Sequence, residues 1–215
     1  MTSERNATSF FDEAFAAQRF MVILRGLTPE RTVELCTAAW EAGITQVEVP
    51  IGSDPARESL EASIEAGARA GRQVGAGTVT RVEQVTYAAR VGASFTVAPG
   101  LDAEVLRACA RHDLPHLPGV ATAGEIQQAQ KLGCEWVKAF PASVLGSGWV
   151  RAMLGPFPRL RVVATGGMNL STADQFLGAG ARVVALGSSL EDPTQLAMLR
   201  AFQRDEPGRS VAKDR

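Results

Sequence analysis

Short apolar runs alternate with longer amphipathic segments along most of the chain. Eight of these runs are bounded by glycine, proline or polar residues, a pattern that is typical of short buried β-strands. The predicted strands cover residues 20–25, 45–50, 72–77, 94–99, 115–120, 135–140, 160–165 and 181–186.

Helical periodicity fills the intervals between these strands. In the first interval Thr28 and Pro29 form a helix start and Gly43 a helix end, and four apolar residues lie on one helical face. These four are Val33, Cys36, Ala39 and Trp40. Further helices are predicted at 55–70, 81–91, 102–112, 122–132 and 171–179, with a shorter one at 147–156. Residues 5–18 predict an additional N-terminal helix.

Strands that alternate with helices predict a parallel sheet, and eight units in one chain favour a closed (β/α)8 TIM barrel. A doubly wound open sheet is the alternative. That fold usually carries a G-x-G-x-x-G fingerprint after its first strand, and "ILRGLTPE" has none. We therefore expect one α/β domain over residues 1–215. The N-terminal helix, within residues 1–19, would cover the lower mouth of the barrel, and residues 206–215 would form a flexible tail.

Composition narrows the class of protein. The 215 residues are 46% hydrophobic and carry a net charge of -1, so we expect no basic surface for nucleic acid. We also expect no membrane segment, because no apolar stretch is long enough to span a bilayer. The N-terminus lacks the apolar stretch of a signal peptide, and Cys36, Cys109 and Cys134 suggest no disulfide framework, so we expect a cytoplasmic protein. His112 and His116 make a poor metal site, and we expect both to be structural residues near loops.

Lys138 is unusual because it lies inside the apolar run "EWVKAF". Its side chain could extend to solvent or neutralise a core carboxylate. Alternatively it is a nucleophile, because burial disfavours the charged form of an amine and a neutral amine attacks carbonyl carbon to form a Schiff base. Periodicity alone leaves both interpretations open.

Glu48 is the second charge inside an apolar strand, in "TQVEVP". It could be a buried counterion for Lys138. It could also be a general acid/base, since a desolvated carboxyl with a raised pKa suits proton transfer. The two roles are compatible, because a buried acid and amine can share a proton.

Glycine-rich turns follow the last two predicted strands. Gly166 and Gly167 precede a helix whose cap is Asn169 or Ser171, and Gly187 and Ser188 precede another turn. Free backbone N–H groups near helix N-termini bind phosphate, and barrels often bind phosphate at these two positions. Tight turns without a ligand are the alternative.

Taken in order, the segments "ILRG", "EVP", "GAGTV", "APGL", "LPGVAT", "VKAFPAS", "TGGMN" and "LGSS" resemble one known family over roughly residues 20–190. This is the family of class I aldolases that cleave 2-keto-3-deoxy-6-phosphogluconate (KDPG). It includes aldolases for 4-hydroxy-2-oxoglutarate (KHG) and 2-keto-3-deoxy-6-phosphogalactonate. The resemblance implies a homotrimeric barrel that needs no metal and no cofactor, because the imine on its lysine does the chemistry. The partner would be a phosphorylated 2-keto acid, cleaved to pyruvate and glyceraldehyde 3-phosphate.

The resemblance also implies roles for single residues. Lys138 matches the Schiff-base lysine and Glu48 the acid/base. Thr78 matches a threonine near the pyruvate carboxylate, and Pro99 a proline that lines the pocket. The residues that match the substrate and phosphate turns are Thr165, Gly166, Gly167, Gly187 and Ser188. "FPAS" is expected to be a turn over the pocket.

One position departs from the phosphogluconate pattern E-V-T-x-R, because Gly52 stands where that branch has an arginine. "EVPIGS" and "ILRG" resemble the phosphogalactonate branch, whereas Thr165 in "ATGG" resembles the phosphogluconate branch. We expect Arg25 to take over the carboxylate contact, because only a guanidinium offers a bidentate grip and Gly52 has no side chain.

Two further functions stay open at this point. A sugar-phosphate isomerase or synthase would use acid/base chemistry on a similar barrel without an imine. A non-catalytic barrel would bind a phosphorylated metabolite without cleaving it.

Overall fold

The computed structural model describes residues 7–52, 54–187 and 194. Every predicted strand is present, and the run at 115–120 forms two short strands instead of one. The strands are β1 (Phe20–Ile23), β2 (Val47–Pro50), β3 (Val74–Gly77), β4 (Thr96–Val97), β5 (His116–Leu117), β6 (Gly119–Val120), β7 (Trp136–Ala139), β8 (Arg161–Thr165) and β9 (Val183–Leu186).

All strand pairs are parallel, in the order β5-β4-β3-β2-β1-β9-β8-β7-β6. The two end strands, β5 and β6, are consecutive parts of one extended segment interrupted at Pro118, so the sheet closes into a ring. Proline has no N–H to donate to a ladder, which accounts for the interruption. Its carbonyl still accepts from the Lys138 N–H at 2.8 Å. The predicted (β/α)8 barrel is therefore confirmed.

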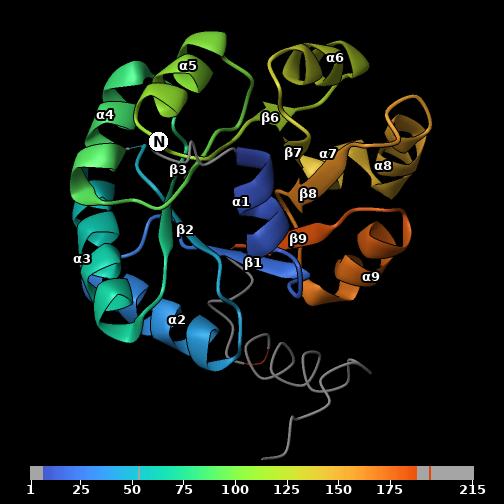
Figure 1. Cartoon of the computed structure of the whole chain (residues 1–215). Coiled ribbons are helices and arrows are strands. Elements are labelled where there is room, and N and C mark those ends of the chain that lie inside the picture. Colours follow the sequence, from blue (N-terminus) through green and yellow to red (C-terminus); the bar gives the residue numbers. More distant parts are fainter. Residues whose placement is uncertain (1–6, 53, 188–193, 195–215) are drawn as a thin grey trace, which may run out of the picture.

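Helices surround this ring (Figure 1). They are α1 (Ala7–Ala14), α2 (Pro29–Glu41), α3 (Asp54–Ala70), α4 (Val82–Val91), α5 (Ala103–Arg111), α6 (Ala123–Lys131), α7 (Ala142–Leu145), α8 (Ser147–Leu154) and α9 (Leu170–Gly178). All helices predicted between strands are confirmed. The one-turn helix α7 was not predicted, and α1 ends at Ala14 rather than at residue 18. The predicted tail at 206–215 lies outside the described residues.

Helix α1 is the exception to the outer ring, because it closes the lower mouth of the barrel as expected. Phe11 and Phe15 are buried, and they pack with Phe95 and Trp136 from the barrel interior. Asp12 fixes the helix by accepting a hydrogen bond from the Trp136 indole N–H at 2.9 Å. This end of the barrel is therefore filled with apolar and aromatic side chains.

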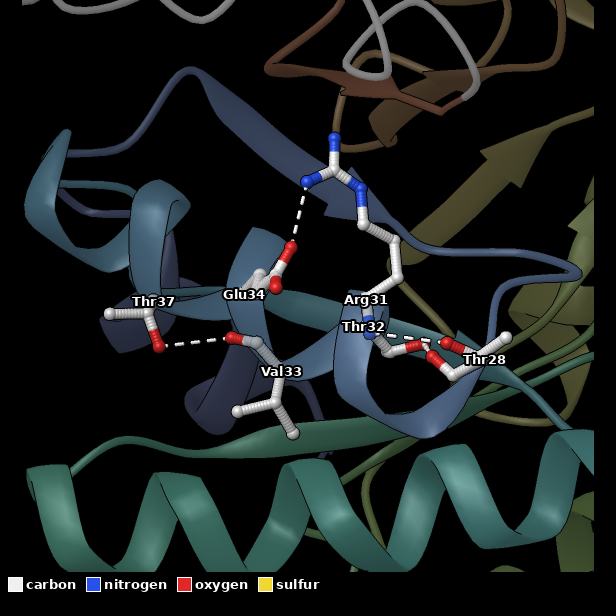
Figure 2. Close-up of polar contacts among 6 residues, drawn as sticks. All are labelled: Thr28, Arg31, Thr32, Val33, Glu34 and Thr37. Atoms are coloured by element: carbon white, nitrogen blue, oxygen red, sulfur yellow. Dashed lines mark hydrogen bonds and ion pairs between the residues drawn. The ribbon is translucent and has the colours of Figure 1, made fainter.

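The start of α2 follows directly from its sequence (Figure 2). The Thr28 hydroxyl accepts from the Arg31 N–H at 3.3 Å, and the Thr32 hydroxyl donates to the Thr28 carbonyl at 2.8 Å. Arg31 also pairs with Glu34 on the exposed face at 2.8 Å. These contacts satisfy polar groups at the helix N-terminus and fix the end of the short β1–α2 loop. That loop contains Arg25.

The two histidines lie at the end of a helix and in a two-residue strand, and both positions are next to loops. His112 ends α5, but His116 lies in β5 and is buried against Thr96, whose hydroxyl is 2.8 Å from its Nδ1. Burial lowers the pKa of His116 to about 4. The three cysteines are buried free thiols. No helix among the described residues is long and apolar enough to cross a membrane.

Candidate active site

A cavity of about 300 Å³ lies at the end of the barrel where the strands finish, away from α1. Lys138 is on its wall, carried by β7 two residues after the buried Trp136. Residues two apart on a strand share a face, so the strand that places Trp136 inside the barrel also places Lys138 there. Only 2% of Lys138 is exposed. The volume suits a small ligand.

Glu48 projects into the barrel from β2 and is fully buried. Neither of its carboxylate oxygens has a hydrogen-bond partner among the described residues. Buried polar atoms without partners are uncommon and need an explanation. A simple counterion for Lys138 would form a hydrogen-bonded pair, whereas this carboxyl lies behind the residues that line the cavity, with neither oxygen paired in the described part of the chain.

The neighbouring strand leaves room for this carboxyl. Gly77 ends β3, and a Cβ atom at that position would overlap the Glu48 carboxyl group. Glycine is therefore required at residue 77 by the close approach of a charged side chain from the next strand, and the predicted motif "GAGTV" gains a structural reason.

The electrostatics of Glu48 follow from its burial. Desolvation raises the pKa of this carboxyl, and the positive charges of Lys138 and Arg25 oppose the shift without cancelling it. A carboxyl whose pKa is moved toward neutral pH can both give and accept a proton, which is the property that general acid/base chemistry needs.

Arg25 and Thr78 meet at the rim of the cavity. Arg25 follows β1 and lines the cavity, and its Nη2 donates to the Thr78 hydroxyl at 3.3 Å. Thr78 adopts the left-handed conformation with φ 58°. A β-branched residue is rare there, and such strain costs on the order of 1–3 kcal/mol. Strain of this kind clusters at functional sites.

Gly52 lies beside this pair. A Cβ at Gly52 would stand 3.7 Å from the Thr78 methyl group, in ordinary van der Waals contact. A side chain at residue 52 would therefore begin next to Thr78, the same hydroxyl-bearing residue that Arg25 reaches from β1. This geometry supports the expectation that Arg25 stands in for an arginine at residue 52.

The "TGG" turn after β8 forms another part of the cavity wall. Thr165 ends β8, and Gly166 and Gly167 have φ 97° and 71°, so both need the freedom of glycine. A Cβ on Gly166 would stand 3.1 Å from the Phe140 ring. The turn leads into α9, whose cap is Asn169, with its side chain accepting from the Thr172 N–H at 3.0 Å.

The structure brings most of the predicted site together. Lys138, Arg25, Thr165, Gly166, Gly167 and Gly187 line the cavity. Ser188 lies outside the described residues. Pro99, after β4, is not among the residues that line this cavity, and it packs instead against Gly119. Its contact with a ligand stays a prediction.

Several lining residues were not predicted. They are Ile23, Leu24, Leu27, Leu35, Phe140, Met168 and Ala185. Phe140 carried a usable signal, because it lies two residues after Lys138 and its ring is 5.1 Å from the Lys138 Nζ. "FPAS" does more than turn: it begins α7, and the Ser143 N–H donates to the Gly166 carbonyl at 3.0 Å.

Within the described ranges, His, Cys, Asp and Glu side chains form no group of three that could hold a metal ion. The polar groups that face the cavity are instead an amine, a guanidinium, a hydroxyl and backbone amides. With the Glu48 carboxyl behind them, this set can form an imine, move protons and bind an anion.

Comparison with known proteins gives a consistent result. The family model for KDPG and KHG aldolases matches residues 12–200. A 2-dehydro-3-deoxy-6-phosphogalactonate aldolase of Escherichia coli K12 is 35% identical over 172 residues, which are 79% of this chain and 83% of the relative. A 2-dehydro-3-deoxy-phosphogluconate aldolase of Treponema pallidum is 35% identical over 184 residues, 85% of this chain and 86% of the relative.

A solved structure adds chemical detail. It is the KDPG aldolase of Legionella pneumophila, with pyruvate captured at low pH as a covalent carbinolamine intermediate. It matches with a TM-score of 0.77 and 27% identity, and the match covers 88% of this chain and 94% of that one.

The raised pKa of Glu48 predicts a specific pH dependence of stability. The folded protein binds the Glu48 proton more tightly than the unfolded chain does. Proton binding by Glu48 therefore stabilises the fold fully below the pKa of about 4.3 that the carboxyl has in the unfolded chain. This stabilisation is lost as pH rises through the higher pKa of Glu48 in the folded protein. Because Glu48→Gln cannot ionise, its free energy of unfolding relative to wild type should increase from about pH 4 upward.

Urea denaturation of both proteins at a series of pH values measures this difference. Glu58→Gln is the matched control, because it removes the same charge from an exposed position on α3. If the Glu48→Gln curve follows the Glu58→Gln curve at every pH, burial does not perturb Glu48.

Proposed function

The chain belongs to the KDPG and KHG aldolase family of class I carbon–carbon lyases, and on that premise we propose that it cleaves 2-keto-3-deoxy-6-phosphogluconate to pyruvate and glyceraldehyde 3-phosphate. 4-Hydroxy-2-oxoglutarate is a second expected substrate of the same chemistry. The observation that carries the proposal is the buried amine of Lys138 on a cavity wall, near a buried carboxyl for which the described residues offer no hydrogen-bond partner.

The reaction begins at Lys138. The nitrogen of Lys138 attacks C2 of the keto acid, and the carbinolamine that forms loses water to give an iminium ion. Glu48 supplies the proton that the departing hydroxyl needs. The free oxygens of its carboxyl and its raised pKa support this role.

Cleavage of the C3–C4 bond follows. Glu48, now ionised, accepts the proton of the C4 hydroxyl, C4 becomes the aldehyde carbon, and the bonding electrons pass to C3 and neutralise the iminium as an enamine. Return of the proton to C3 and attack of water on C2 release pyruvate and free Lys138. One carboxyl therefore serves each proton transfer in turn.

Two anion sites hold the substrate in this proposal. The carboxylate next to C2 binds Arg25 and Thr78, which already contact each other. The phosphate binds the "TGG" turn before α9, where backbone N–H groups and the helix N-terminus favour an anion. Gly187 and Ser188 complete the phosphate site in the proposal.

2-Keto-3-deoxy-6-phosphogalactonate is the second candidate substrate. It is supported by the 35% identity to the Escherichia coli phosphogalactonate aldolase, by the absence of an arginine at residue 52 and by Arg25 at the cavity. Thr165, whose side chain is buried in the cavity wall, supports the gluconate. Initial rates on the two C4 epimers decide between them, and faster cleavage of the galactonate would reverse the assignment.

The assembly and location remain predictions. The resemblance implies a homotrimer, and the cysteine usage is typical of a cytoplasmic protein.

Pyruvate and borohydride test the proposal directly. We expect incubation with pyruvate, followed by reduction, to leave one covalent adduct that peptide mass mapping places on Lys138. Lys138→Met should form no adduct and lose turnover while it stays folded, because methionine fills nearly the same volume as the lysine side chain.

Lys131→Met is the matched control, since Lys131 is exposed on α6. Without an adduct on Lys138 in the wild type, the aldolase proposal is wrong. Binding of phosphorylated substrate without pyruvate release would then favour the non-catalytic barrel, and turnover without trapping would favour an isomerase or synthase.

The carboxylate contact of Arg25 makes a separate prediction. Arg25→Lys should raise the pyruvate concentration that gives half-maximal trapping by about tenfold, because a bidentate charge-assisted contact contributes about 1.5–3 kcal/mol. Adding Gly52→Arg should recover part of the loss, because a side chain from residue 52 starts beside Thr78. Arg31→Lys, on the outer face of α2, is the matched control. An unchanged concentration for Arg25→Lys rules the contact out.

A further inference from the structure

The strained backbone of Thr78 must be held by its surroundings. Thr78 is the first residue after β3, and its φ of 58° is unfavourable for a β-branched residue. On either side of it, the Gly77 carbonyl accepts from the Ile51 N–H at 2.9 Å and the Val79 N–H donates to the Val97 carbonyl at 3.0 Å. These bonds fix the residues next to Thr78. They do not reach the loop beyond Val79.

Gln84 reaches that part of the loop. It lies in the first turn of α4 and is only 4% exposed. Its side-chain carbonyl accepts from the Thr80 N–H at 2.8 Å and from the Arg81 N–H at 3.1 Å. Two backbone donors therefore identify this atom as the oxygen, which leaves the NH₂ group on the other side.

That NH₂ group joins a second loop. It donates to the Ile51 carbonyl at 3.4 Å, immediately before Gly52. One side chain thus connects the end of β2 with the loop after β3, and the Ile51 N–H bond to Gly77 completes a closed set of contacts. Thr78 lies inside this set, with its hydroxyl toward Arg25.

We propose that Gln84 is a positioning residue for the substrate carboxylate. It holds the β2 and β3 loops together, keeps Thr78 in its left-handed conformation and so fixes the hydroxyl that orients the Arg25 guanidinium. This inference rests on the proposed function, in which Arg25 and Thr78 bind the carboxylate next to C2. It adds a residue that does not line the cavity.

An ordinary helix cap is the alternative role. Glu125 shows what such a cap looks like on α6, where its carboxylate accepts from the Ala121 N–H at 2.8 Å and the Thr122 N–H at 2.9 Å. Both residues cap a helix through the same local pattern. Of these two residues, only Gln84 has an additional bond to another loop. Comparing substitutions at Gln84 and Glu125 therefore distinguishes a positioning role from helix capping.

The experiment compares Gln84→Met with Glu125→Met in the full chain. For Gln84→Met we expect the half-saturating pyruvate concentration for borohydride trapping to rise about tenfold, because small displacements of positioning groups have large effects. The trapping rate at saturation should change less than about threefold. Inhibition by inorganic phosphate, which reports on the "TGG" turn after β8, should stay within about twofold of wild type.

Glu125→Met should lower thermal stability without that rise. Gln84→Glu gives a second, conservative test, because a carboxylate still accepts from Thr80 and Arg81 but has no N–H for Ile51. We expect it to recover the thermal stability of the helix start while the half-saturating concentration stays raised. Gln84 is only a cap if Gln84→Met and Glu125→Met change pyruvate and phosphate binding equally. It is also only a cap if Gln84→Glu restores both the thermal stability and the half-saturating pyruvate concentration of the wild type.

A crystal structure of Gln84→Met separates this inference from the proposed function. We expect Thr78 to leave its positive φ and to lose the hydrogen bond from Arg25. If both features persist, the positioning role is wrong even when pyruvate is trapped on Lys138. If the wild type traps no pyruvate, the aldolase proposal fails, and the geometry of Thr78 in the variant still decides whether Gln84 holds it.

Discussion

The desolvation of Glu48 is the constraint on which the rest of the site depends. A carboxyl buried inside a barrel loses its hydration, and the penalty for a buried ion is several kcal/mol unless nearby charges and hydrogen bonds offset it. Lys138 and Arg25 supply only partial compensation through their charges. The result is a carboxyl with a raised pKa whose two oxygens have no hydrogen-bond partner in the ranges that the structure describes, close to a cavity that the Lys138 amine lines.

The same constraint explains why the two ends of the barrel differ. At the lower mouth, Phe11 and Phe15 of α1 pack against Phe95 and Trp136. Burial of these apolar side chains stabilises the fold without the desolvation penalty of a buried charge. At the other end, glycines replace side chains wherever groups must approach closely, as Gly77 does beside Glu48. A strained Thr78 and an unpartnered carboxyl are tolerated there because the packed end and the helix layer supply the stability.

Much of this arrangement could be predicted from the sequence, because it depends on local patterns. Short apolar runs located every strand, and a charge inside such a run identified Lys138 and Glu48. The resemblance then located Thr78, and the departure from the family pattern at Gly52 pointed to Arg25. Contacts between distant segments could not be predicted in the same way: the cavity walls from Leu27 and Leu35, the bond from Gln84 to Ile51, and the reason for Gly77 all depend on how strands and helices meet. The short helix α7 escaped prediction because one helical turn has no periodicity to detect.

A crystal structure of the wild-type protein soaked with pyruvate is the sharpest test of imine formation at Lys138. We expect a covalent bond between the Lys138 Nζ and C2 of pyruvate, with the carboxylate on Arg25 and the Thr78 hydroxyl and a Glu48 oxygen facing the C2 substituent. Pyruvate bound without a bond to Lys138, bonded to another lysine, or with its carboxylate on the "TGG" turn would contradict it.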